Sequence, residues 1–81
     1  MTTHAQLYKA EAQSQYEYLA EAVPEYGIEH VRGRAQADIA MRNFTAIPAG
    51  RTAPSWWRIR QRARAKGAIR FLRDTKMDKA A

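Results

Sequence analysis

The sequence predicts a small, mainly α-helical domain of three helices, and three observations indicate this. The chain has 81 residues, which is one domain at most, and a chain of this length buries only about 60% of its unfolded surface. The hydrophobic residues, 46% of the total, include 16 alanines and leave 21 larger apolar side chains. These side chains mostly recur at spacings of three and four. So small a core suits a few packed helices better than a β-sandwich or an α/β enzyme.

The first helix is expected over residues 3–24. Thr3 and Gln6 have the spacing of a capping box, in which each side chain accepts a hydrogen bond from the backbone N–H of the other residue. Pro24 disfavours helical backbone at the residue before it, and Gly27 can adopt a positive φ angle. The helix should therefore end close to these two residues.

An apolar stripe along this helix is assigned to the core. Its members recur at helical spacing, while Lys and Glu fall mostly between them, as is typical of an amphipathic helix. The stripe consists of Tyr8, Ala12, Tyr16, Leu19, Ala20 and Val23. The same pattern suits a homodimer interface built on Tyr8, Tyr16 and Leu19.

A second helix is expected over residues 28–44, where helical spacing of apolar residues ends with Met41 or Phe44. Gly33 lies inside this range and costs about 1 kcal/mol relative to alanine. A shorter helix that begins after Gly33 is therefore the alternative. Residues 45–54 contain two prolines and a glycine and are expected to form a loop.

The third helix is expected over residues 54–66, with Thr52 or Ser55 as its cap. A helical wheel predicts that only a narrow seam of it is buried, formed by Trp56, Ile59 and Ala63. Trp57 lies about 100° from Trp56 and either stacks on arginines or a base, or adds a second core position. The arginines on that side are Arg60 and Arg64.

Two conformations are open for residues 68–74. Ile69 and Phe71 alternate with Arg70, which favours a short strand after a break at Gly67. The alternative is a helix that continues past Gly67 and buries Ala65, Ala68 and Leu72. Periodicity does not decide between the two.

Charge divides the chain. Residues 1–30 hold one cation against five acidic residues, a net charge of −4, whereas residues 31–81 hold 13 cations against three acidic residues, a net charge of +10. The positive part should attract polyanions. Ten of its 13 cations are arginines, whose guanidinium groups bind phosphate or carboxylate in a bidentate manner. A solvated basic surface without a specific partner is the simpler interpretation.

Several classes of chemistry are not expected. The chain has no cysteine, which excludes disulfides, thiolate zinc sites and a cysteine nucleophile. The two histidines, His4 and His30, have no base or metal-ligand pattern around them, and the glycines match no phosphate-binding loop. No apolar run is long enough to span a membrane. We therefore expect a cytoplasmic, non-enzymatic protein without metal or cofactor.

The segment 54–73 resembles the third helix and first wing strand of winged helix-turn-helix proteins. It reads PSWWRIRQRARAKGAIRFLR, and Gly67 fits the turn before the wing. Residues 34–44 and 3–23 would then correspond to the second and first helices. The loop 45–54 is longer than the usual tight turn of this family, and little chain follows for a second wing strand.

The resemblance implies that the helix 54–66 enters the major groove of DNA. The base edges would be contacted by Ser55, Trp57, Arg58 and Arg62. Phosphates would be contacted by Arg60, Arg64, Lys66, Arg70 and Arg73, and Arg51 in the loop would clamp the backbone. One groove cannot use every cation, so some should pair with Glu17 or Glu21 of the first helix.

Two functions follow from these patterns. The first is a small nucleic-acid-binding protein, a DNA-binding regulator or accessory factor, although composition does not separate DNA from RNA. The second is a non-enzymatic interaction module, such as an adaptor, inhibitor or assembly component. Its Arg- and Trp-rich helix would dock on an acidic protein surface. Membrane binding is disfavoured because the apolar seam of the third helix is narrow.

Overall fold

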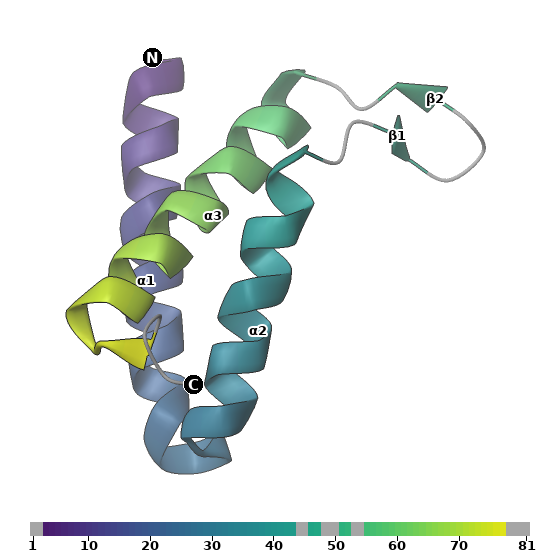
Figure 1. Cartoon of the computed structure of the whole chain (residues 1–81). Coiled ribbons are helices and arrows are strands. Elements are labelled where there is room, and N and C mark those ends of the chain that lie inside the picture. The colour runs from purple at the N-terminus through teal and green to yellow at the C-terminus, as the bar shows by residue number, and fades with distance from the viewer. Residues whose placement is uncertain (1–2, 44–45, 48–50, 53–54, 78–81) are drawn as a thin grey trace.

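The computed structural model describes residues 3–43, 46–47, 51–52 and 55–77, and these residues are mainly helical (Figure 1). The elements in chain order are helix α1 (His4–Tyr26), helix α2 (Ile28–Ala40), the 3-10 turn η1 (Met41–Asn43), strand β1 (Ala46–Ile47), strand β2 (Arg51–Thr52) and helix α3 (Ser55–Asp74). The prediction of a small domain built on three helices is confirmed. Figure 1 shows α1 and α3 running in the same general direction, with α2 returning in the opposite one.

The ends of α1 follow from local sequence. The Thr3 hydroxyl accepts a 3.1 Å hydrogen bond from the Gln6 N–H, and the Gln6 side chain accepts a 2.9 Å bond from the Thr3 N–H. The predicted capping box is therefore confirmed. At the other end Pro24 lies within the last turn, and Gly27 ends the helix with φ of 88° and ψ of 158°. This positive φ is open to glycine because it has no Cβ.

Helix α2 begins at Ile28 and passes through Gly33 without a break, so the alternative of a helix that starts after Gly33 is wrong. It ends four residues before the predicted boundary, because the chain tightens into the 3-10 turn η1 at Met41. Phe44, at the predicted end, lies outside the described residues. Within the expected loop 45–54, strands β1 and β2 form a short antiparallel ladder that pairs Ala46 with Thr52 and Ile47 with Arg51.

Helix α3 continues through Gly67 to Asp74, so the strand alternative for residues 68–74 is wrong and these residues form no β wing. Ala68, Phe71 and Leu72 continue the buried face of the helix beyond the glycine, which itself lies where two backbones approach closely. A Cβ atom added to Gly67 would overlap the carbonyl oxygen of Ala12 and lie 3.2 Å from the backbone nitrogen of Tyr16. Gly67 therefore allows α3 to cross α1 closely and does not end the helix.

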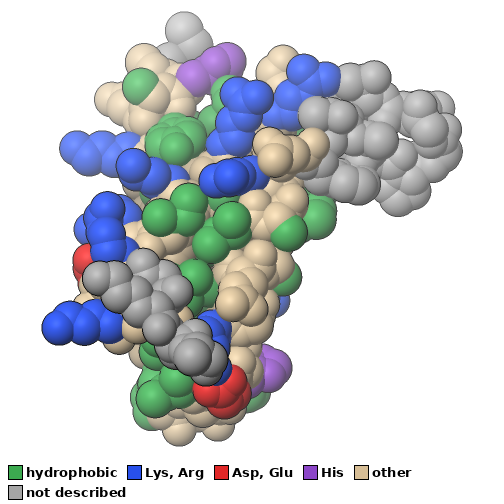
Figure 2. All heavy atoms as spheres, in the orientation of Figure 1, with side chains coloured by type: hydrophobic (Ala, Val, Ile, Leu, Met, Phe, Trp, Pro, Cys, Tyr) green, Lys and Arg blue, Asp and Glu red, His purple; other side chains and the backbone are tan. Residues whose placement is uncertain are grey.

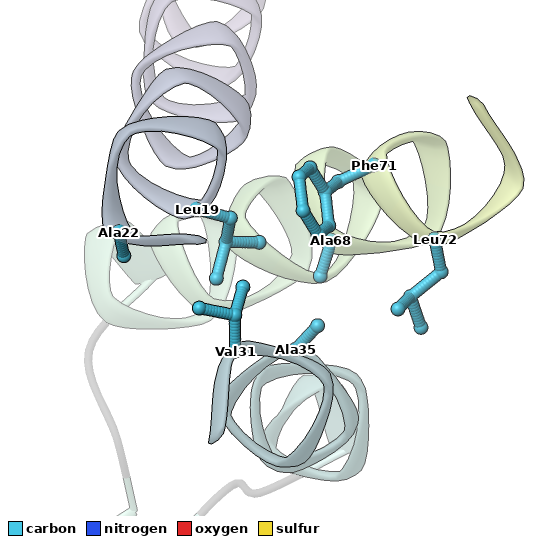
Figure 3. Close-up of a cluster of buried hydrophobic side chains, with 7 residues drawn as sticks. All are labelled: Leu19, Ala22, Val31, Ala35, Ala68, Phe71 and Leu72. Atoms are coloured by element: carbon cyan, nitrogen blue, oxygen red, sulfur yellow. The ribbon is translucent and has the colours of Figure 1, made fainter. Parts of the chain in front are cut away.

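The core lies where the three helices meet (Figure 3). Its buried members are Leu19 and Ala22 of α1, Val31 and Ala35 of α2, and Ala68, Phe71 and Leu72 of α3. The Tyr16 ring packs edge-on against Phe71, with centroids 5.9 Å apart. The predicted α1 stripe is therefore right for Ala12 and Leu19, which are buried in the monomer, and wrong for Ala20, which is exposed.

A buried polar contact joins α1 to α2. The Gln15 amide donates a 2.6 Å hydrogen bond to the Asp38 carboxylate, and both side chains are buried. Arg34 donates a longer bond, of 3.4 Å, to the other oxygen of Asp38. A buried carboxylate needs such donors to offset the loss of its hydration. This contact fixes how α2 packs along α1.

Candidate nucleic-acid interface

Helix α3 is covered on two sides, by α1 and by α2, and this decides which of its cations are exposed. The buried side chains are Gln61, Ala63, Ala65, Ala68, Phe71 and Leu72, together with Gly67. They occupy far more of the helix surface than the narrow seam predicted from the sequence. Seven residues of α3 are exposed, and all of them except Trp56 and Asp74 fall within about 60° of one another on a helical wheel. These five are Ser55, Arg62, Lys66, Ile69 and Arg73, which we call the outer stripe of α3.

Two of the predicted phosphate-binding residues, Arg60 and Arg64, point towards α1 and share the carboxylate of Glu11. The Arg64 Nε donates a 3.0 Å hydrogen bond to it, and the Arg60 Nε lies 3.8 Å away. Pairing between the third and first helices was predicted, but Glu17 and Glu21 were the wrong partners. The close crossing at Gly67 sets the register, because it places Ala12, and therefore Glu11 beside it, next to the arginines.

Of the two tryptophans, Trp56 was predicted to be buried, which is wrong, and Trp57 was left open between stacking and a core position. Trp56 is 53% exposed and carries the Arg60 guanidinium over its ring at 5.7 Å, whereas Trp57 is half-buried. The Nε1 of Trp57 and the Nε of Arg58 are buried without a hydrogen-bond partner among the described residues. In this arrangement, neither Trp57 nor Arg58 is presented on the outer stripe for contact with base edges.

Near the end of α3, Arg70 lies beside an aromatic ring and Arg73 beside an acidic side chain. The Arg70 guanidinium lies 5.0 Å from the centre of the Tyr16 ring, and Arg73 is exposed with its Nε 3.9 Å from Asp74. The Tyr16 hydroxyl donates a 2.8 Å hydrogen bond to Asp74. This bond to a carboxylate, with a smaller effect of partial burial, raises the pKa of Tyr16 above its ordinary value of 10.0.

Two hollows adjoin the outer stripe and form what we call the basic groove. One has a volume of about 350 Å³ and is lined by Tyr8, Arg42, Asn43, Arg62, Ala65, Lys66 and Ile69. The other has a volume of about 250 Å³ and is lined by Tyr8, Lys9, Ala12, Gln13, Lys66 and Arg70. Tyr8 and Lys66 line both hollows, so the two are adjacent. Of the described residues that line them, five are cations and none is acidic.

The groove brings together predicted and unpredicted residues. Arg62, Lys66 and Arg70 were predicted, whereas Lys9, Arg42 and Asn43 were missed and Tyr8 was assigned to the core or a dimer interface. These four come from α1 and η1, far from α3 in sequence. In the sequence, nothing beyond their contribution to the overall composition marked these four residues as members of a site. Arg51 lies in β2, and its side chain is outside the described part of the chain.

Acidic residues gather at the other end of α1. Glu21 and Glu25 line a third hollow of about 180 Å³ with Tyr18, Ala22 and Tyr26, and Glu29 forms an ion pair with Arg32. Lys9 and Glu25 are about 24 Å apart along the helix axis. In Figure 2, most Lys and Arg side chains lie in the half of this face nearer the N-terminus of α1, and the visible Asp and Glu side chains lie in the other half. This division in space differs from the one along the sequence, because Lys9 of the acidic first part lines the basic groove and Arg32 of the basic second part lies at the acidic end.

The described residues bring no three His, Asp or Glu side chains together as a metal site. In the same part of the chain, every helix is too short or too polar to cross a membrane. Comparison with known proteins found no family model, no curated protein and no solved structure that matches this chain.

Proposed function

We propose that this protein binds nucleic acid through the basic groove and the outer stripe of α3. One observation carries the proposal: the groove is lined by five cations from three elements, Lys9, Arg42, Arg62, Lys66 and Arg70, and by no described carboxylate. Contacts to phosphates supply most of the affinity of such proteins and release bound counterions. A DNA-binding regulator or accessory factor is the role that fits this chemistry.

The contacts inside α3 favour binding to the phosphate backbone over reading of base edges in a duplex. Of the four residues expected at base edges, Ser55 and Arg62 are exposed, whereas Trp57 and Arg58 are half-buried. The guanidinium groups of Arg60 and Arg64 are already engaged by Glu11. On α3, Arg62 and Lys66 are exposed and have no salt bridge among the described residues, so they are available to a polyanion.

A protein partner is the second candidate, and the exposure of Trp56 favours it. Trp56 is 53% exposed and Arg60 stacks on it, and these two residue types dominate the energetic centres of protein interfaces. Such a partner would present an acidic surface. Substitution of Trp56 should weaken that complex strongly, but it should affect binding to phosphates through the groove only weakly.

The test is fluorescence anisotropy with labelled DNA and RNA oligonucleotides at several salt concentrations, with an acidic unrelated protein as a parallel ligand. We expect the logarithm of the binding constant to fall linearly with the logarithm of the salt concentration. The slope should approach about −4 if the groove cations each neutralise one phosphate. Binding to the acidic protein alone would support the second candidate.

A matched pair of variants separates the groove from net charge. Arg62→Gln removes a groove cation, and Arg32→Gln removes one that is paired with Glu29 at the acidic end. Both lower the net charge by one. We expect Arg62→Gln to weaken binding and to reduce the salt slope by about 1, and Arg32→Gln to change little. Equal losses in both variants, or no binding at low salt, would contradict the proposal.

A further inference from the structure

We infer that the basic groove takes an unpaired base of a single-stranded nucleic acid, with the Tyr8 ring as the surface on which that base stacks. The inference rests on the proposed function and makes it specific. It concerns which form of nucleic acid is bound and which side chain distinguishes it.

The position of Tyr8 suits a ring on which a base stacks. It is half-buried on α1 and lines both hollows, whose volumes are about 350 and 250 Å³. Apolar groups of Ile69 and Ala65 line the larger recess with it. Aromatic side chains in a positive groove bind single strands because every base offers a flat face for stacking.

The cations around Tyr8 are spaced to follow a strand. Arg62, Lys66 and Arg70 occur at every fourth residue, which places them about 6 Å apart along α3. Lys66 lines both recesses, Arg62 lines the larger one and Arg70 the smaller. An extended strand that lay along this row would present successive phosphates to them while a base turned towards Tyr8. In the larger recess, Asn43 offers an amide that can both donate and accept hydrogen bonds at a base edge.

A duplex fits this groove less well. Its bases are stacked on one another and their faces do not reach a recessed tyrosine, so only its phosphates would meet the rim. Two of the four residues expected to enter a major groove from α3, Trp57 and Arg58, are half-buried. Residues 68–74 are helical and supply no wing strand to contact a duplex. A single strand can use both parts of the groove, the cations and the aromatic ring.

The experiment compares four ligands of one sequence by anisotropy: single-stranded DNA, its RNA counterpart, the duplex, and single-stranded DNA with an abasic site at each position in turn. We expect either single strand to bind about tenfold more tightly than the duplex. An abasic site at the inserted position should remove much of that difference.

Variants of Tyr8 complete the test, with circular dichroism melting as the check on folding. Tyr8→Leu should lose about tenfold in affinity for the single strand and little for the duplex, whereas Tyr8→Phe should bind like the parent protein. Tyr26→Leu, at a tyrosine that is 55% exposed at the acidic end, is the control and should change neither. Equal affinity for single strand and duplex, or equal affinity of Tyr8→Leu and Tyr8→Phe for the single strand, would overturn the inference and leave the proposed function standing. Binding to none of the ligands would overturn the proposed function itself.

Discussion

On the inner side of α3 the arginines are engaged within the molecule, whereas on its outer stripe they face solvent. Arg60 and Arg64 meet the carboxylate of Glu11. Arg62, two residues from each of them, is exposed and lines the basic groove. The helix turns by about 100° per residue, so alternate arginines of one run reach opposite environments. An arginine-rich helix is thus not a uniform basic surface, and only part of its charge is available to a partner.

The largest expected effect on stability comes from adding a methyl group where α1 and α3 cross most closely. Gly67→Ala places a methyl group against the backbone of Ala12 and Tyr16, and backbone cannot move aside as a flexible side chain can. We expect the free energy of unfolding to fall by about 3 kcal/mol, as in overpacked cores. Urea unfolding followed by circular dichroism measures this. An unchanged midpoint would contradict the close crossing of the two helices.

Gly33→Ala is the counterpart of Gly67→Ala, because the same substitution should change the free energy of unfolding in the opposite direction. A Cβ at Gly33 would meet no atom within 4 Å, and the residue lies inside a helix. Alanine should therefore raise the free energy of unfolding by about 1 kcal/mol through its higher helix propensity. The same urea experiment measures both variants. A loss of stability here would mean that α2 is not helical at this position.

A smaller effect is expected on the side of α3 that meets α1. Glu11→Gln removes the carboxylate shared by Arg60 and Arg64, whose side chains are 41% and 34% exposed. The free energy of unfolding should fall by about 0.5–1 kcal/mol at low salt, and by less at high salt because such pairs are screened. Glu17→Gln, at an exposed residue bonded to Gln13, is the control. A loss as large in the control would show that net charge, and not this pair, is responsible.

The smallest effect concerns alkaline pH. The hydrogen bond from Tyr16 to Asp74 favours protonated tyrosine in the folded state and raises its pKa above 10.0. The stabilisation should therefore be present at pH values below the ordinary tyrosine pKa and should disappear as the pH rises through the raised value. Melting curves of the parent protein and Tyr16→Phe should differ at neutral pH and converge at high pH, with Tyr26→Phe as the control. A constant difference across the pH range would argue against this hydrogen bond.

The sequence by itself determined the features that depend on neighbouring residues. The capping box of Thr3 and Gln6 needs only a spacing of three, and the turn at Gly27 needs only a residue without a Cβ. The locations of the three helices and the division of charge follow in the same way from periodicity and composition. Three cations of the candidate site, Arg62, Lys66 and Arg70, could also be predicted, because they lie on one helix with a basic sequence.

Tertiary structure alone decided which side of each helix is covered. A helical wheel shows which residues share a face, but α3 packs against two partners, and the wheel does not say where each one lies. The sequence therefore placed Trp56 inside, which is wrong, and left Trp57 open between a stacking and a core position. It also left open whether Gly67 breaks the helix, whereas the structure makes this glycine a point of close contact within it. The basic groove could not be predicted from the sequence for the same reason, because a helical wheel does not show which helices lie next to one another. Tyr8 and Arg42 meet α3 only because packing brings α1, η1 and α3 together, and that arrangement depends on contacts between residues far apart in the chain.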